Sequence, residues 1–276
     1  MHIRCRPVPG QRHPVEHATS NVIALPTAGL FALHPTERHP VLATPGHAVF
    51  LSCGRPYRVS FPGCIGDECI TLRLTPEGLD RLLPEAMAGD GFEEATPFAR
   101  ALLSPAAVLA RSLLERRVTG VAVDPLEIEE LGIGLLRSAL GAVRPLDRPR
   151  PQARHVERVK EAICVEPGRK WTLAELAALA GVSPFHLAHV FQREVGTSVH
   201  RYAMHARLAQ ALQAVLDARL DITSIALDAG FASHSHFTAR FRACFGITPD
   251  ALRRSARGAQ VASLRKIVTA RMAAAA

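Results

Sequence analysis

The sequence of 276 residues has no long apolar run and no apolar signal-peptide core. A membrane-spanning helix requires about 20 consecutive apolar residues, and a secretory signal requires an apolar stretch close to its start. We therefore expect a cytoplasmic protein without a membrane partner. Intracellular thiols are kept reduced, so we expect the six cysteines to be free thiols. They are Cys5, Cys53, Cys64, Cys69, Cys164 and Cys244.

The short motifs that carry catalysis in common enzyme classes are also missing. The chain contains no G-x-S-x-G, no Walker phosphate-binding loop and no H-E-x-x-H. Metal-dependent barrel enzymes cluster histidine and carboxylate ligands, whereas His34, His39 and His47 are scattered and no H-x-H occurs in the N-terminal half. We therefore expect no enzyme activity, no cofactor and no bound metal.

The N-terminal cysteines leave one alternative open. Cys53, Cys64 and Cys69 lie within seventeen residues, and Cys5 could be a fourth ligand. Zinc sites usually show paired C-x₂₋₄-C spacing, and the C-x₄-C here only approaches it. Buried inert thiols are the main expectation, and a metal- or thiol-responsive protein that uses these cysteines is the alternative.

Positive charge is concentrated in the C-terminal half. Residues 1–148 contain 15 basic and 16 acidic side chains, whereas residues 149–276 contain 18 basic and 9 acidic ones. A concentration of this kind is typical of a protein that binds a polyanion. The balance changes within Ala142–Gln152, which has three prolines and three arginines. We interpret this segment as a linker, because proline cannot continue a helix.

The N-terminal half has the pattern of a β-rich domain. Pro, Gly and Asp separate six short runs of strand-forming residues, Val22–Leu25, Gly29–Leu33, Val41–Ala43, Ala48–Leu51, Tyr57–Phe61 and Cys69–Leu74. This punctuation favours a small antiparallel barrel or jelly roll. A helix is expected from Pro76, capped by Thr75. Leucine stripes predict two more helices, about 98–117 and 126–143, and this hairpin could cover the barrel or pair with a second copy.

The C-terminal half contains an internal repeat, in which residues 173–198 recur as residues 222–249. The offset is 49 before the turn and 50 after it, so that Leu173, Leu176, Gly181, Leu187 and Phe191 return as Ile222, Ile225, Gly230, Phe237 and Phe241. Each unit has the pattern of a helix, a tight turn with glycine and a second helix. This is the plan of a helix-turn-helix motif, whose second helix enters the major groove of DNA.

The first unit has a cap and a turn residue at each expected place. Thr172 is predicted to cap the first helix and Gly181 to adopt the left-handed conformation of the turn. Ser183 is predicted to cap the second helix, with Pro184 at its first position. The apolar face should form the core, and the opposite side should meet the groove through Phe185, His186, Ala188, His189 and Gln192. Phe185 suits contact with a thymine methyl, with docking on a neighbouring helix as the alternative.

The second unit repeats this arrangement. Gly230 forms the turn, Ser233 caps the second helix, and its phenylalanines face inward. The residues expected to face DNA are His234, Ser235, Thr238, Ala239 and Arg242. Arg240 occupies the place of Val190, so we expect it to pair with a phosphate or a carboxylate at the helix edge.

A run of helix-forming residues connects the units at about 199–218. Twenty residues of helix span about 30 Å, close to the ~34 Å between successive major grooves on one face of DNA. One domain could therefore place both second helices in adjacent grooves.

Residues of about 155–256 resemble the DNA-binding domain of the AraC/XylS family of bacterial transcription regulators. The matching segments are LAELAALAGVS and FQREVGTS in the first unit, and IALDAGFASHSHF and FGITP in the second. One departure is Val199, where the family usually has a proline; Pro249 keeps that position in the second unit. The resemblance implies base contacts from the outward residues. It also implies that the second motif is often the less sequence-specific, and Ala188 and Ala239 stand where the family often has longer polar side chains.

The segments GLFALH, AVFLSCGRPYRVSFP and GDECITLRL are similar to cupin-like sensor domains that precede such DNA-binding domains. The expected fold is thus α+β, with a cupin-like β-barrel and helical hairpin at 1–145, a linker at 146–154, an all-α double helix-turn-helix domain at 155–257 and a tail at 258–276. The expected function is a sequence-specific transcription regulator, an activator controlled by a small effector. Tyr57, Arg55 and Arg58 could anchor that effector. The expected partners are double-stranded DNA, RNA polymerase, the effector and a second copy of the chain.

Overall fold

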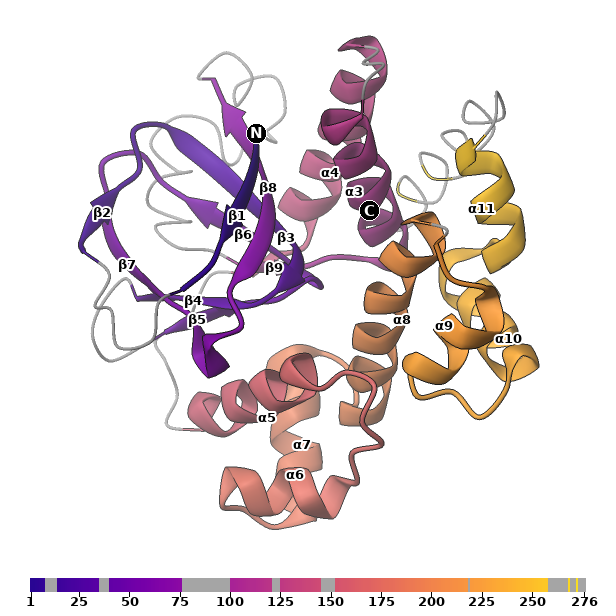
Figure 1. Cartoon of the computed structure of the whole chain (residues 1–276). Helices are drawn as coiled ribbons and strands as arrows, with labels where there is room; N and C mark the ends of the chain where they lie inside the picture. The colour runs from indigo at the N-terminus through magenta and orange to yellow at the C-terminus, as the bar shows by residue number, and fades with distance from the viewer. Residues whose placement is uncertain are drawn as a thin grey trace. The chain divides into compact units, whose positions relative to one another are not determined.

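The computed structural model describes residues 1–7, 14–34, 40–75, 100–120, 125–144, 152–217, 219–257, 268 and 272. The chain divides into two compact units (Figure 1). The first unit comprises Met1–Arg148 together with Ile267–Ala276, and the second comprises Pro149–Lys266.

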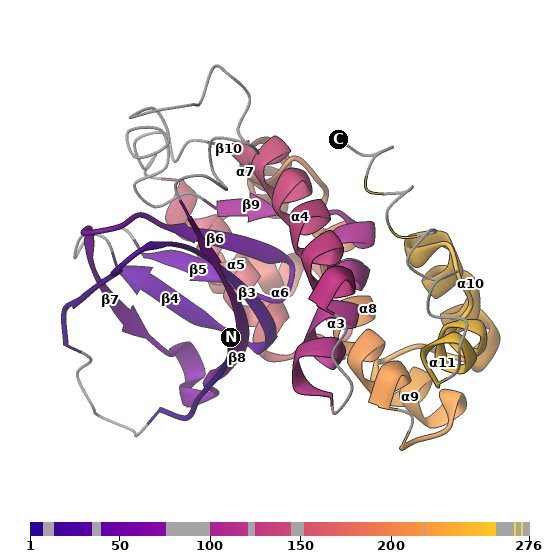
Figure 2. The same ribbon diagram turned by 90° about the horizontal axis from the view of Figure 1, so that it is seen from above.

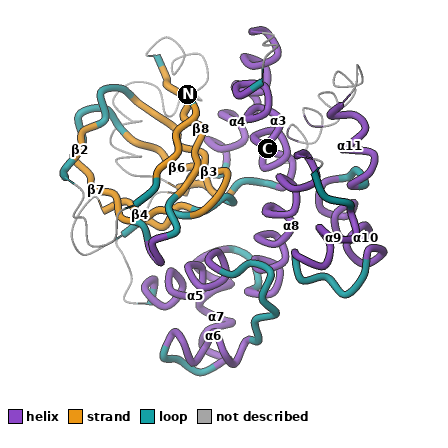
Figure 3. Tube along the Cα trace, in the orientation of Figure 1, coloured by secondary structure: helices purple, strands orange, loops and turns teal. Residues whose placement is uncertain are grey.

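The first unit contains two antiparallel sheets, drawn in orange in Figure 3. One has the order β1-β8-β3-β6-β9-β10, formed by His2–Cys5, Asp67–Leu74, Asn21–Gly29, His47–Leu51, Arg100–Leu102 and Val143–Arg144. The other has the order β2-β7-β4-β5, formed by Glu16–His17, Pro56–Ser60, Phe31–His34 and Val41–Ala43. A short 3₁₀ turn, Pro62–Cys64, precedes β8.

The inner faces of the two sheets share one apolar core. Phe31 and Leu33 of β4 belong to the same buried cluster as Val49 of β6 and Cys69 of β8. Six of these strands confirm the runs read from the sequence. The strands that the structure describes form two sheets, and no hydrogen-bonded pairing joins one sheet to the other among them. Of the two expected forms, a barrel or a jelly roll, a closed barrel is therefore not formed by the described strands.

Two helices accompany the sheets, α3 (Pro105–Thr119) and α4 (Pro125–Gly141), and they pack against each other. The predicted helix of 98–117 was too long at its start, because residues 100–102 form β9. Ser104 caps α3 by accepting a hydrogen bond from the Ala107 amide, and Pro105 fits its first position. The predicted helix of 126–143 ends at Gly141 and is followed by β10. The helix expected from Pro76 lies outside the described residues.

A buried arginine joins α3 to the six-stranded sheet. The Arg111 guanidinium donates hydrogen bonds to the carbonyl oxygens of Pro26, in β3, and Pro45, in the turn before β6. The side chain is completely buried, and burial lowers the pKa of Arg111 to about 10. The guanidinium therefore remains a cation at neutral pH, and its carbonyl partners stabilise it inside the unit.

The second unit is entirely helical, with seven helices from α5 to α11 among its described residues. They are Ala153–Val165, Leu173–Ala180, Pro184–Val195, Val199–Asp217, Ile222–Asp228, His234–Phe245 and Pro249–Arg257. Helix α8 packs against α5 and α7 on one side and against α9, α10 and α11 on the other (Figure 2). The repeat and its connecting helix are therefore confirmed. Helix α5 was not predicted and includes residues 153–154 of the expected linker, whose residues 146–151 lie outside the described part.

Each half of this unit has its own core. Leu187, Val190 and Phe191 of α7 pack with buried residues of α5 and α6. In the second half, rings of Phe237 and Phe241 meet edge to face with centroids 5.4 Å apart, and Phe241 and Phe245 follow at 4.7 Å. Aromatic pairs at these separations add to the free energy gained by burial. The 3.6-residue period of α7 and α10 thus fixes which side of each helix faces away from the core.

No single helix of the described chain is both long and apolar enough to cross a membrane. Helices α6 and α7 pass that test only as a pair, with a bend of 85° between them.

Candidate nucleic-acid interface

The first helix-turn-helix motif begins with a complete capping box. The Thr172 hydroxyl accepts a hydrogen bond from the Glu175 amide at 3.2 Å, and the Glu175 carboxylate accepts one from the Thr172 amide at 2.8 Å. Bonds from Thr172, followed by one from Arg169, lower the pKa of Glu175 to about 2. The helix ends at Gly181, whose φ of 71° is the left-handed value predicted for the turn.

Helix α7 presents the predicted first reading face. The Ser183 hydroxyl caps it by accepting a hydrogen bond from the His186 amide at 3.2 Å. Phe185 is 85% exposed, so it is not docked on a neighbouring helix of the described second unit. His186 is half-buried, and the exposed predicted residues are Phe185, Ala188, His189 and Gln192.

Helix α10 presents the second face. Ser233 caps it through the His236 amide at 3.2 Å. His234 is half-buried, and the exposed predicted residues are Ser235, Ala239, Arg240 and Arg242. Thr238 differs from the expectation, because its hydroxyl oxygen is buried and has no hydrogen-bond partner among the described residues.

Sequence reasoning missed His236. This side chain is exposed, and its Nε2 accepts a hydrogen bond from Nε of Arg240 at 3.4 Å. The signal was present, because the offset of 50 makes His236 the counterpart of His186. Arg240 therefore has a histidine partner on its own helix, one turn away, where a phosphate or carboxylate partner was expected.

A close backbone contact joins the two motifs. A Cβ atom on Gly230, whose φ is 78°, would lie 2.1 Å from the carbonyl oxygen of Gly168, so only glycine fits there. Nε of Arg207, on α8, donates to the carbonyl oxygen of Pro167 at 2.8 Å and holds the same loop. The turn of the second motif is thus fixed against the loop that leads into the first.

Basic side chains surround the first motif and are partly engaged with carboxylates. Arg169 pairs with Glu166 and Glu175, each at 3.1 Å, and stacks over the ring of Trp171. Arg193 pairs with Glu194 at 2.9 Å. Exposed Arg201 and Lys170 add positive charge. Such groups can donate hydrogen bonds to phosphate oxygens, which position a protein on DNA without reading its sequence.

In the described part of the structure, the N-terminal cysteines are not gathered into one metal-binding group. Cys53 and Cys64 are exposed, Cys5 is half-buried and Cys69 is buried. The Cys69 thiol donates a hydrogen bond to Asp67 at 2.7 Å, and burial raises the pKa of Cys69. Within the described part of the chain, the one group able to hold a metal ion contains no cysteine.

Comparison with known proteins finds a family match within the second unit. A family model described as a helix-turn-helix domain matches residues 176–255. The virulence regulon transcriptional activator VirF of Yersinia enterocolitica is 28% identical over 167 residues, which cover 58% of this chain and 62% of that protein. The thermoregulatory protein LcrF of Yersinia pestis is 29% identical over 174 residues, covering 59% and 62%.

Among solved structures, a probable AraC family transcriptional regulator from Rhodopseudomonas palustris is 32% identical and covers 38% of this chain and 98% of that one, with a TM-score of 0.36. The chain thus spans about three fifths of the length of the two Yersinia relatives. The matched residues 176–255 contain both turn glycines and the serine caps of α7 and α10. This helix-turn-helix region is therefore that of an AraC/XylS-type transcription regulator.

Proposed function

We propose that this protein is a sequence-specific, DNA-binding transcription regulator and not an enzyme. The observation that carries the proposal is the pair of exposed helix faces, on α7 and α10, within one compact unit. Each face lies opposite a buried core and begins at a serine cap. The excess of basic side chains in residues 149–276 supplies the attraction to a polyanion.

The two faces have different chemistry. On α7, His189 and Gln192 can hydrogen-bond base edges, and Phe185 can contact a thymine methyl. On α10, Arg242 can contact a phosphate or a guanine, whereas Ala239 offers only a methyl group. We therefore propose that α7 carries most of the sequence preference and that α10 contributes more evenly to all duplexes.

Duplex selection from a random-sequence library, followed by fluorescence anisotropy on the selected and a scrambled duplex, tests this proposal. Affinity should fall steeply between about 50 and 200 mM salt, because each phosphate contact releases counterions. Arg242→Ala should weaken binding, whereas Arg137→Ala, which removes an exposed arginine of α4 in the first unit, is the matched control. No duplex binding at low salt, or equal losses from both variants, contradicts the proposal.

We propose further that the first unit binds a small effector between or beside its two sheets. Tyr57 supports this, because it packs against the shared apolar core while burial raises its pKa to about 12. Arg55 and Arg58 are exposed nearby on β7 and the turn before it. An effector controls DNA binding only by its different affinity for two states of the protein. Deletion of residues 1–145 is the test, and unchanged regulation of the target promoter under all conditions would exclude a sensor.

We also propose a homodimer formed through α3 and α4. The leucines on which this rested, such as Leu113 and Leu135, are buried in the single chain. The remaining apolar surface includes Leu126, which is 60% exposed. Sedimentation of wild type and Leu126→Glu at micromolar concentration should give a dimer and a weakened dimer. A wild-type monomer, with and without DNA, excludes the interface.

The protein partner we propose is RNA polymerase, with activation as the outcome. VirF, which this chain resembles, is named as a transcriptional activator. A reporter fused to a selected duplex should rise when the protein is expressed. A fall in reporter output would assign repression instead.

A further inference from the structure

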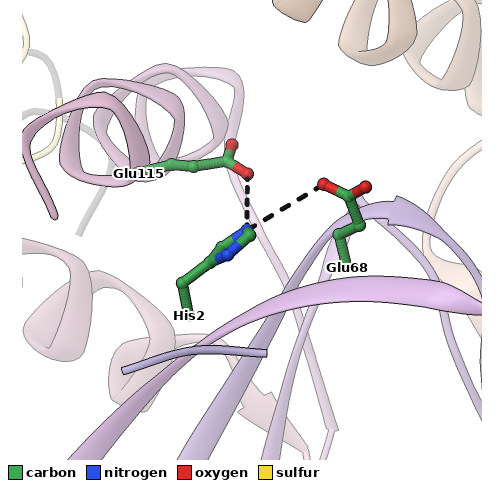
Figure 4. A group of neighbouring side chains, drawn as sticks. All are labelled: His2, Glu68 and Glu115. Atoms are coloured by element: carbon green, nitrogen blue, oxygen red, sulfur yellow. Dashed lines mark ion pairs between the residues drawn. The ribbon is translucent and has the colours of Figure 1, made fainter. Parts of the chain in front are cut away.

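Three side chains that lie far apart in the sequence converge in the first unit. They are His2 of β1, Glu68 of β8 and Glu115 of α3 (Figure 4). Nε2 of His2 lies 3.5 Å from Oε1 of Glu115 and 3.9 Å from Oε2 of Glu68. One ligand atom from each residue lies within 4.8 Å of the other two.

Backbone pairing holds the histidine in this place. The Met1 ammonium group donates to the Thr71 carbonyl at 2.9 Å, and the Thr71 amide donates to the Met1 carbonyl at 2.8 Å. His2 is the cross-strand neighbour of Ile70, so it shares a sheet face with Glu68, two residues away. Glu115 reaches this face from α3.

The atoms that converge are those of a transition-metal site. An imidazole nitrogen and carboxylate oxygens bind zinc at about 2.0–2.2 Å, so the ligand atoms of a tetrahedral site are about 3.3–3.5 Å apart. The His2–Glu115 separation fits this, and the His2–Glu68 separation needs to shorten by a few tenths of an ångström. The side chains of His2, Glu68 and Glu115 are 24%, 32% and 14% exposed, so water can supply a fourth ligand.

Two arginines support the carboxylates without filling the site. Nε of Arg4 donates to Oε1 of Glu68 at 2.7 Å, which leaves Oε2 directed toward His2. Hydrogen-bonded carboxylates of this kind orient metal ligands. Arg111, one turn before Glu115 on α3, interacts electrostatically with that carboxylate.

We propose that His2, Glu68 and Glu115 form a binding site for a divalent transition-metal ion of the zinc class, which joins β1 and β8 to α3. Magnesium is disfavoured, because it prefers an all-oxygen octahedral shell. Its three ligands belong to the first unit, and none of them lies on the proposed DNA-reading helices α7 and α10.

Metal titration of the full chain, starting at Met1 and carrying a C-terminal tag, tests the site. Competition of Zn²⁺ with a fluorescent chelator should give one ion per chain, and Mg²⁺ should not compete. His2→Ala, Glu68→Gln and Glu115→Gln should each weaken zinc binding at least about tenfold. His17→Ala and Glu129→Gln remove an exposed histidine and an exposed glutamate elsewhere in the same unit, and they should leave it unchanged.

Co²⁺ identifies the ligands, because thiolate ligands add an intense charge-transfer band that nitrogen and oxygen ligands lack. Wild type should show only weak visible bands, and these should be absent in Glu115→Gln. A thiolate band, zinc binding that survives all three ligand variants, or no zinc binding overturns the proposal. Circular dichroism of each apo variant checks its fold. If His2→Ala has lost the fold, His2→Gln replaces it. If each substitution lowers the melting temperature by the same amount with and without zinc, the three residues form only an ion pair.

Discussion

Replacing Gly230 with alanine should destabilise the second unit more than replacing Gly181, although the two glycines are repeat equivalents. Both have a left-handed backbone, with φ of 78° and 71°. Their neighbours differ. A Cβ on Gly181 meets nothing within 4 Å, whereas a Cβ on Gly230 would lie 2.1 Å from the carbonyl oxygen of Gly168. Comparing the two variants therefore separates the free-energy cost of a left-handed backbone from the cost of the steric contact.

The expected costs follow from these two differences. A non-glycine residue in the left-handed region costs roughly 1–2 kcal/mol, and this cost applies to both variants. Overpacking costs roughly 1–3 kcal/mol more, and it applies only at Gly230, because the clashing atom is backbone and cannot rotate away. Gly181→Ala should thus cost about 1–2 kcal/mol and Gly230→Ala about 2–5 kcal/mol.

Urea unfolding of the full chain, followed by the fluorescence of Trp171, measures this difference. Trp171 is the chain's one tryptophan and lies in the second unit. With a slope of about 1–3 kcal/mol per molar urea, a 2 kcal/mol difference separates the midpoints by roughly 1 M. Gly168→Ala tests the contact between loop and turn from the loop side. A Cβ there would lie 2.9 Å from the Asp228 carbonyl oxygen, so this variant should also be destabilised. Equal midpoints for Gly181→Ala and Gly230→Ala would refute the reasoning.

Three further predictions concern single side chains. Because hydrogen bonds from Thr172 and then Arg169 lower the pKa of Glu175 from 4.5 to about 2, its contribution to stability is complete above pH 4.5 and is lost as the pH falls through about 2. Glu175→Gln should remove that acid-dependent part, and a variant with the wild-type pH profile would contradict it. Arg111→Met should cost about 3–6 kcal/mol, because each of its two hydrogen bonds to carbonyl oxygens comes from a charged group and contributes about 1.5–3 kcal/mol. Faster hydrogen exchange of α3 amides would show this, and unchanged exchange would not fit. Gln192→Ala should reduce the preference for selected over scrambled duplexes by about 1–3 kcal/mol, whereas Arg242→Ala should weaken binding to both duplexes. Fluorescence anisotropy on the two duplexes measures both effects, and equal losses on the two duplexes for Gln192→Ala would contradict its assigned role.

The helix-turn-helix unit was predictable because its determinants are local. Thr172, Ser183 and Ser233 each precede a helix by one position and bond its third amide. The apolar period then assigns the buried side of each helix and, by exclusion, the exposed one. Thr238 differs from this expected exposure because it follows the inward Phe237, where the hydroxyl of a small polar side chain can be buried.

The N-terminal unit was less predictable because its shortest strands depend on partners far along the chain. Strand β9 has three residues and β10 has two, too few to show an alternation of apolar and polar residues. Each strand adjoins a stronger helical pattern, so both were predicted as ends of the neighbouring helices. Their pairing, Ala101 with Val143, closes a loop of about forty residues that no local signal marks.

The metal-ligating group shows why motif searches fail in such a unit. Cys53, Cys64 and Cys69 are close in the sequence, but the fold leaves two exposed and buries the third. His2, Glu68 and Glu115 carry no spacing signature, and the β1–β8 register with the packing of α3 brings them together. Side chains alternate between sheet faces, so a slip of one residue in that register would turn His2 away from both glutamates. A ligand set of this kind depends on strand pairing and helix packing, so sequence proximity alone does not reveal it.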